Sequence, residues 1–297
     1  MSSDTPPTTP LGTAPDPVPD RRPRPGLSPS RANDYLQCPL LFRFRVVDRL
    51  PEPPSAAATR GTLVHAVLEG LFDLPAGSRT HEAAVAALPA AWQAMVEERP
   101  DLVEVLPAGD DLDPWFAPAR DLLATYFTLE DPNRLQPAER EMVVRLDLAE
   151  DLELRGVVDR LDVAPDGALR VVDYKTGRSP RAGYEGSALF QMRFYALLLA
   201  RLRGRMPAML QLIYLGDGVV VRHTPDEAEL ESTERRVRAI WESVQTSARE
   251  DSWNPKRGPL CPWCAHQSIC PAFGGTAPPS DPARVEVAIG VRPAEGV

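Results

Sequence analysis

The pattern of apolar and polar residues divides the chain into a helical part, a strand-rich part and a second helical part. In the first part apolar residues recur at helical spacing, with polar residues between them. Ser28 lies in the position where serine caps the start of a helix. We expect helices over residues 28–38, 60–74, 81–98 and 114–128.

The pattern changes near residue 139, where β-branched residues become frequent. Three runs, EMVVRLDL, LRGVVDRLDV and LRVVDYKT, are separated by the polar segments AEDLE and APDG, which predicts a three-stranded meander. A helix over 189–203, a buried strand over 209–215, a strand over 219–223 after a GDG turn and a charged helix over 226–249 follow. This order of elements indicates an α/β fold.

Both ends of the chain lack such patterning. Residues 1–26 are rich in Pro, Thr, Asp and Arg, and they cannot bury enough apolar surface to offset the entropy lost on ordering. Pro, Gly and Ala dominate residues 274–297, although residues 285–291 are compatible with a short strand. We expect disordered tails around one domain over residues 27–273.

Composition and charge limit the function. The sequence has no long apolar segment typical of a signal peptide or a membrane span, so we expect a cytoplasmic protein. The net charge of −9 argues weakly against a nucleic-acid partner, because a local basic track can lie on an acidic protein. Candidates for such a track, each equally explained as a solvated face, are Arg178, Arg181, Arg201, Arg203 and Arg205.

The basic residues are almost all arginine, and Lys175 and Lys256 are the two lysines among 33 basic residues. A lysine in such a chain points to a role for a compact ammonium group, which can lie beside a reacting oxygen. Lys175 lies two residues after Asp173, so both side chains share one face of a strand.

Two carboxylates end neighbouring predicted strands. Asp159 ends the run GVVD and Asp173 ends VVD, and the short turn between these strands makes them neighbours. Oxygen ligands of this kind hold the divalent ions that phosphodiester hydrolysis requires. An Asp-x-Lys sequence alone is more often a surface ion pair, so the combination of groups carries the hypothesis.

The strings GVVDRLD, VVDYKTG and QMRFYALLL, with GTLVH upstream, resemble the motifs of RecB-family nucleases in the PD-(D/E)xK superfamily, in their usual order. The resemblance covers residues 27–273. It implies a restriction-endonuclease-like core, with a mixed central sheet flanked by helices. It also implies a helical insertion within about 59–135, a catalytic core over about 136–225 and a cysteine-rich segment over about 250–273.

The resemblance also assigns roles to individual residues. It makes His65, Asp159 and Asp173 ligands of Mg²⁺ or Mn²⁺, together with the backbone carbonyl of Tyr174. It makes Lys175 the group that orients the attacking water. The family's QxxxY motif falls on Gln191 and Tyr195, one helical turn apart. A further acidic position falls on Glu139, with Glu141 as the alternative. Each of these residues also has an interpretation without a function. His65 could be a helix histidine that faces solvent, and Gln191 and Tyr195 could be residues at the edge of the core.

Four cysteines, Cys38, Cys261, Cys264 and Cys270, place one thiol far upstream of a C-x2-C-x5-C group. Disulfides do not suit a cytoplasmic protein of this size, so a metal centre is the better account, and four thiolates suit zinc or an iron–sulfur cluster. The pattern resembles the [4Fe-4S] staple of the bacterial helicase–nuclease AddB, related eukaryotic helicase–nucleases and CRISPR adaptation nucleases. Such a staple would close a loop of more than 200 residues, and its role would be stability.

These observations predict a metal-dependent DNA exonuclease that acts on single-stranded ends in repair or recombination. The sequence holds no P-loop string, so unwinding would need a separate helicase. Trp253 and Trp263, with Tyr195, are candidates to stack on bases, although both tryptophans equally suit shielding of a cluster. The alternatives are a catalytically silent DNA-binding subunit and a CRISPR adaptation nuclease. The helical insertion between Leu74 and Leu135 favours the general exonuclease.

Overall fold

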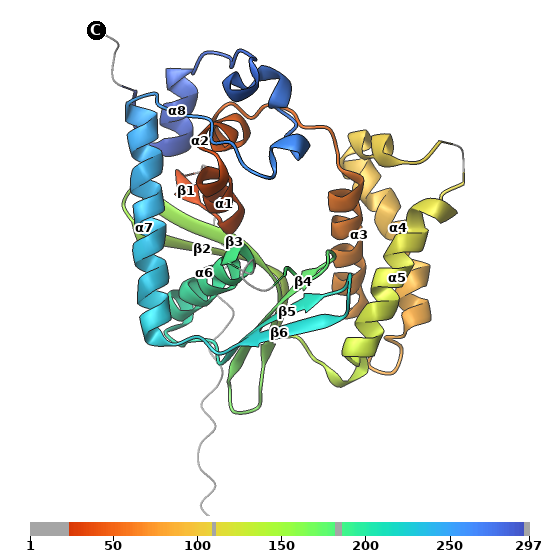
Figure 1. Ribbon diagram of the computed structural model, residues 1–297. Coiled ribbons are helices and arrows are strands. Elements are labelled where there is room, and N and C mark those ends of the chain that lie inside the picture. Colours follow the sequence, from red (N-terminus) through yellow and green to blue (C-terminus); the bar gives the residue numbers. More distant parts are fainter. Residues whose placement is uncertain (1–23, 109–110, 182–185, 294–297) are drawn as a thin grey trace, which may run out of the picture.

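The computed structural model describes residues 24–108, 111–181 and 186–293 (Figure 1). The disorder expected for residues 1–23 concerns residues outside these ranges. Gly26 and Leu27, which we placed at the tail boundary, form a short strand that joins the central sheet.

The described strands form one mixed sheet. They are β1 (Gly26–Leu27), β2 (Glu139–Ala149), β3 (Leu152–Val163), β4 (Leu169–Lys175), β5 (Met209–Tyr214) and β6 (Val219–His223). Strand β2 runs antiparallel along one edge of β3. The other edge of β3 is shared by β1, which is parallel to it, and β4, which is antiparallel. Strand β5 lies parallel to β4, and β6 pairs antiparallel with β5.

Helices cover both faces of this sheet (Figure 1). The helices α3 (Ala56–Leu71), α4 (His81–Glu98) and α5 (Asp113–Leu129) enclose one core, to which Val172 and Ile213 contribute. The helices α6 (Gly186–Arg203) and α7 (Glu227–Arg249) enclose the other, to which Val171 and Leu212 contribute. Successive residues of β4 and β5 thus enter opposite cores, as the alternation of side chains along a strand requires.

Shorter elements complete the second core. They are α1 (Pro29–Gln37), α2 (Pro39–Phe42), the π-helical η1 (Arg43–Val47) and α8 (Pro282–Ile289). The 3₁₀ turns are η2 (Pro100–Val105), η3 (Pro132–Arg134), η4 (Cys261–Trp263), η5 (Gln267–Ile269) and η6 (Pro271–Phe273).

The predicted α/β class and mixed sheet flanked by helices are confirmed. The helix over 81–98 and the strand over 219–223 have the predicted bounds. Ser28 caps α1, because its hydroxyl accepts a hydrogen bond from the backbone N–H of Arg31 at 3.2 Å. The helix expected over 60–74 instead begins at Ala56 and ends at Leu71.

The expectation for residues 274–297 is wrong for α8. A strand over 285–291 was compatible with the sequence, but Pro282–Ile289 forms a helix. Asp281 caps this helix by accepting a hydrogen bond from Ala283 N at 2.9 Å. Val285 and Ile289 lie one turn apart on it, and both are fully buried in the core.

Candidate active site

Strands β3 and β4 separate where the candidate carboxylates lie. Their paired residues end at Arg160 and Val172, and one further step along the register sets Asp159 opposite Asp173. In place of a backbone pair, Asp159 Oδ2 accepts a hydrogen bond from Tyr174 N at 2.7 Å. The two strands thus stop pairing at the step where both carboxylates lie.

Glu141 adds a third carboxylate from β2. The pairs on either side of it, Arg140 with Arg160 and Met142 with Val158, set Glu141 opposite Asp159. Its φ of 42° lies in the left-handed region, which is unusual for a residue other than glycine and interrupts the β2–β3 pairing here. This local distortion directs the Glu141 carboxylate toward α3.

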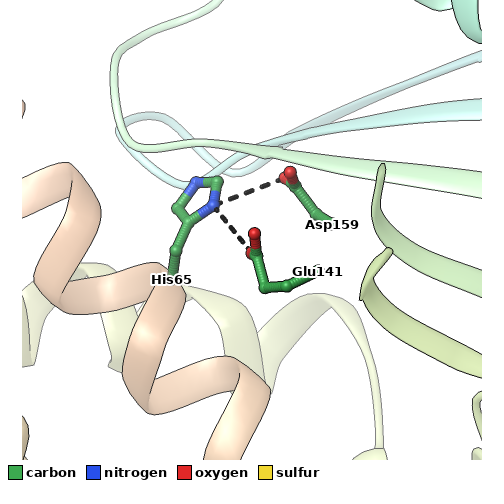
Figure 2. A group of neighbouring side chains, drawn as sticks. All are labelled: His65, Glu141 and Asp159. Atoms are coloured by element: carbon green, nitrogen blue, oxygen red, sulfur yellow. Dashed lines mark ion pairs between the residues drawn. The ribbon is translucent and has the colours of Figure 1, made fainter. Parts of the chain in front are cut away.

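His65 of α3 completes the group (Figure 2). Its Nδ1 lies 3.5 Å from Asp159 Oδ2 and 3.7 Å from Glu141 Oε1, and its Nε2 lies 3.0 Å from the carbonyl oxygen of Tyr174. Ligand atoms of His65, Glu141 and Asp159 all lie within 4.8 Å of one another. One turn earlier, a Cβ at Gly61 would lie 3.1 Å from Thr176 Oγ1, so glycine there lets α3 approach the end of β4.

A second set of contacts joins β4 to α6. Lys175 Nζ lies 2.7 Å from Asp173 Oδ2 and donates to Gln191 Oε1 at 2.8 Å. Gln191 Nε2 donates to Asp173 Oδ1 at 2.8 Å and to the hydroxyl of Tyr195 at 3.0 Å. The amide of Gln191 therefore fixes the positions of a carboxylate, an ammonium group and a phenol at once.

The electrostatics of the site favour a bound cation. Burial, and then the charge of Asp173, raise the pKa of Asp159 to about 7. Burial also raises the pKa of Asp173, although Lys175 opposes the shift. Burial disfavours the charged form of His65, but Glu141, Asp159 and Asp173 outweigh it and raise its pKa. Burial is thus the main cause of both carboxyl shifts, and for Asp159 the charge of Asp173 adds to it.

A buried arginine, Arg160, holds the side chain of Tyr174 next to the site. Arg160 is 1% exposed, and its guanidinium donates to Glu130 Oε2 at 2.7 Å and to Glu130 Oε1 at 3.0 Å. It also donates to the hydroxyl of Tyr174, whose carbonyl faces His65. The phenol of Tyr174 is therefore anchored on one side of the sheet while its backbone carbonyl borders the site.

The structure brings seven predicted groups together: His65, Asp159, Asp173, the Tyr174 carbonyl, Lys175, Gln191 and Tyr195. Of the two alternatives for the further acidic position, Glu141 is the one that approaches His65, at 3.7 Å. The nearest cation to Glu139 is Arg203, at 3.9 Å. The sequence signal that favoured Glu141 was its position close to the start of the predicted strand. Its left-handed backbone was not readable from the pattern.

Most of the predicted basic track is already paired. Arg201 lies 2.7 Å from Glu234, Arg203 approaches Glu139, and Arg205 donates to the carbonyl of Asp166 at 3.4 Å. Arg178 is different, because it lines a cavity of about 820 Å³ that also includes His65. That cavity opens the site toward solvent between α3 and the end of β4.

The four cysteines line one cavity of about 290 Å³ between the start of α2 and residues 255–273. Backbone N–H groups donate to two of the sulfurs, from Lys256 to Cys38 Sγ at 3.4 Å and from Gly258 to Cys261 Sγ at 3.3 Å. Among the described residues, one set of three or more His, Cys, Asp or Glu side chains has its ligand atoms within 4.8 Å of one another. That set is His65, Glu141 and Asp159, and it contains no cysteine. The four sulfurs are therefore not gathered at the spacing of a single-ion site.

The two tryptophans differ in exposure. Trp253 is 5% exposed and stacks on Phe42 with ring centroids 6.1 Å apart, so it packs in the core. Trp263, beside Cys264, is 79% exposed. Of the two candidates for base stacking, Trp263 alone presents a free ring face.

Comparison with known proteins agrees with this geometry. Residues 26–271 match the family model of the PD-(D/E)XK nuclease superfamily, and the chain belongs to that superfamily. It is 24% identical over 275 residues to the Gene 69 protein of Mycobacterium phage D29, covering 83% of this chain and 96% of that protein. A crystal structure from Eubacterium rectale, described as a candidate exonuclease, is similar with a TM-score of 0.55 at 13% identity, covering 86% of this chain and 91% of that one. This second likeness supports the fold alone.

The family defines a nuclease fold with an acidic site for divalent metal and a DNA substrate. No described helix has the length and apolar character needed to span a membrane.

Proposed function

We propose that the protein is a RecB-type, metal-dependent DNA exonuclease that acts on single-stranded ends in repair or recombination, with unwinding supplied by a separate helicase. The observation that carries this proposal is the convergence of His65, Glu141 and Asp159 beside the Asp173–Lys175–Gln191 contacts. A catalytically silent subunit would have no need to keep all of these groups in contact.

The donor set fits Mg²⁺ or Mn²⁺. His65, Glu141, Asp159, Asp173 and the Tyr174 carbonyl would hold the ion, and oxygen-rich sites with one imidazole suit these metals. When bound, such an ion activates water and stabilises the charge that develops on the leaving oxygen. Burial and then the charge of Asp173 raise the pKa of Asp159, and this supports the assignment because a bound cation would offset both effects.

The protein's own groups position the reactants. Lys175 contacts Asp173 and Gln191 and lines the cavity that includes His65, so its remaining N–H can donate to a water or a phosphate bound there. There the ammonium group orients the water and offsets negative charge on the phosphate. Tyr195, by accepting from Gln191 Nε2, keeps the amide from rotating away.

The test is cleavage of labelled single-stranded and duplex DNA with Mg²⁺ or Mn²⁺, comparing the wild type with Asp173→Ala and Lys175→Ala. We expect both variants to lose at least about 100-fold in rate, as the removal of a single electrostatic group from an active site typically costs. End labelling of the products distinguishes exonuclease from endonuclease action.

Lys256→Ala is the matched control for Lys175→Ala. Lys256 lies near Cys38, where its Nζ donates to the Leu36 carbonyl at 3.0 Å, so its loss should leave the cleavage rate unchanged. A wild-type protein that cuts neither substrate with either metal would overturn the proposal in favour of the silent subunit.

We further propose that Cys38, Cys261, Cys264 and Cys270 hold a [4Fe-4S] cluster that ties the start of the domain to residues 250–273. Their shared cavity supports a metal centre. Burial raises the pKa of the Cys264 thiol, and the nearby Cys270 and Cys38 add to the shift, as in a site that gathers thiolates. The choice of an iron–sulfur cluster over zinc rests on the resemblance of the cysteine spacing to that of iron–sulfur nucleases, because both centres can be held by four thiolates.

Absorption and paramagnetic resonance spectra of protein purified without oxygen, with iron, sulfide and zinc analysis, test this second proposal. We expect iron and sulfide near four per chain in the wild type, and loss of both in Cys264→Ser. Stoichiometric zinc without iron would overturn it.

A further inference from the structure

A notch interrupts the sheet beside the active site. On the edge of β3 that β1 and β4 share, β1 pairs with Glu153 and Leu154, and β4 pairs from Arg160 onward. The intervening residues 155–159 have no strand partner on that edge. A cavity of about 480 Å³ lies there, lined by the start of α1, the middle of β2 and β3, and Gln191 and Tyr195 of α6.

Two arginines face each other in this notch. Arg145 of β2 and Arg155 of β3 are directly opposite in the antiparallel register, and both line the cavity. Like charges directly opposite on paired strands destabilise a sheet. Burial lowers the pKa of Arg155, and the charges of Arg145 and of Arg49, whose φ is 52°, act in the same direction.

None of these three guanidinium groups has a hydrogen bond or an ion pair with another residue of the described part of the chain. Glu153 acts on Arg155 from nearby, but no ion pair joins them in the described part of the chain. Asp34 lies 2.6 Å from Arg45 and so is already engaged. An anion bound in the notch would offset the repulsion between the arginines.

An exposed apolar pair lies between the arginines and the carboxylates. Val143 and Val157 face each other in the register, are 62% and 40% exposed, and line the same cavity. Along β2 and β3 they occupy the positions between the Arg145–Arg155 pair and the Glu141–Asp159 pair. The distance from arginines to carboxylates is four residues, or about 13 Å along the strands.

The geometry points to a subsite for an unpaired nucleic-acid strand, in which Arg145, Arg155 and Arg49 bind backbone phosphates and Val143 and Val157 contact a base. This inference rests on the proposed nuclease function and specifies its substrate. A base reaches an apolar surface of this kind only when it is not stacked inside a duplex, so the notch selects a single strand. The strand then runs past Gln191 and Tyr195 to the carboxylates.

The test is binding of a fluorescent single-stranded oligonucleotide, followed by anisotropy without divalent metal so that cleavage does not interfere. We expect Arg145→Ala/Arg155→Ala to weaken binding about tenfold or more at low salt. We also expect the slope of log affinity against log salt to fall by about 1.4, since each phosphate contact on a single strand contributes about 0.7. Val143→Ala/Val157→Ala should weaken binding without changing that slope.

Two controls keep the result interpretable. Arg235→Ala/Arg292→Ala removes the same charge from exposed positions outside the notch and should leave affinity and slope near the wild-type values. Arg145→Lys/Arg155→Lys retains the charges and should keep most of the affinity. Thermal unfolding of the double alanine variant should show no loss of stability, because a repulsive pair has been removed.

The three possible failures are distinct. If the wild type binds and cuts DNA while the double alanine variant keeps full affinity and slope, the phosphate subsite is wrong and the nuclease function stands. If the wild type binds a blunt duplex as tightly as a single strand, the single-strand selection is wrong. If the wild type neither binds nor cuts DNA, the proposed function itself fails.

Discussion

One amide side chain joins the acidic and basic groups of the candidate site. Gln191 accepts from Lys175 and donates to both Asp173 and Tyr195, so each of its polar atoms has a partner within 3.0 Å. The orientation of the amide is therefore fixed by three contacts, and reversing it would place N–H groups against the Lys175 ammonium. The position of the Tyr195 ring depends in turn on Gly156, because a side chain there would collide with the ring.

The first prediction concerns that glycine. A Cβ at Gly156 would lie 2.5 Å from Tyr195 Cε1, so Gly156→Ala must displace the phenol ring and, through it, Gln191. We expect a loss of about 1–3 kcal/mol in the free energy of unfolding and a reduced cleavage rate. Chemical denaturation and single-turnover cleavage measure the two effects.

Gly70→Ala is the matched control, since no atom lies within 4 Å of a Cβ there and the residue lies inside α3. That change should stabilise the protein by about 0.5–1 kcal/mol without affecting cleavage. Equal activity in the two variants would show that the Tyr195 contact does not position Gln191.

At the scale of elements, α8 shows how a short C-terminal segment adds to the core. Val285 and Ile289 are fully buried, while Val287, between them in sequence, is 67% exposed. Replacing a buried large aliphatic side chain by alanine lowers the free energy of unfolding by about 2–5 kcal/mol, because it leaves a cavity.

The second prediction follows from this contrast. Ile289→Ala should lower the free energy of unfolding by about 2–5 kcal/mol, whereas Val287→Ala, on the exposed face of the same helix, should change it by less than about 0.5 kcal/mol. Urea denaturation of both variants measures the difference. Similar small losses in the two would mean that α8 does not pack on the core.

The same helix marks the limit of what the sequence could predict. Long segments with strong periodicity, such as residues 81–98, were readable because one face of the helix is consistently apolar. The segment VEVAI alternates like a strand, and only the Asp281–Pro282 start indicates a helix. The order of α and β elements, in contrast, was sufficient to predict the α/β class, and the resemblance to RecB-family nucleases predicted the mixed sheet.

The site was partly predictable for a related reason. Asp159, Asp173 and Lys175 follow from strand ends and alternation, because these are local properties of the sequence. Glu141 was not resolved from Glu139, because its place depends on a left-handed residue that interrupts the β2–β3 pairing. The arginine pair of the notch could not be predicted from the sequence, because it depends on the register between β2 and β3, and neither strand alone determines that register.

At the scale of the whole molecule, contacts between distant segments hold the cysteine-rich region in place. Glu52 accepts from Arg45 at 2.7 Å and lies 2.9 Å from His266 Nε2, so it connects the segment after η1 to the loop that carries the cysteines. The hydrogen bond from Arg45 lowers the pKa of Glu52, and His266 adds to the shift.

The third prediction is the pH dependence of this contact. Because the pKa of Glu52 is lower in the folded protein than in the unfolded chain, its stabilisation is complete above the ordinary glutamate pKa and is lost as pH falls through the lowered value. Acid below the ordinary glutamate pKa of 4.5 should therefore make residues 250–273 more sensitive to protease. In Glu52→Gln, residues 250–273 should be more sensitive to protease already at neutral pH. Lowering the pH should then cause no further increase through position 52. A wild type and variant with parallel pH profiles would contradict the assignment.

The packing of α8 also brings the first and last described residues of the chain together. A Cβ at Gly290 would lie 3.1 Å from the ring of Pro25, so residues that are 265 positions apart in sequence are neighbours in space. A short peptide that replaced the residues outside 24–293 could therefore join these two positions directly, and a new start and end of the chain could be opened at an exposed turn without separating the elements of the core.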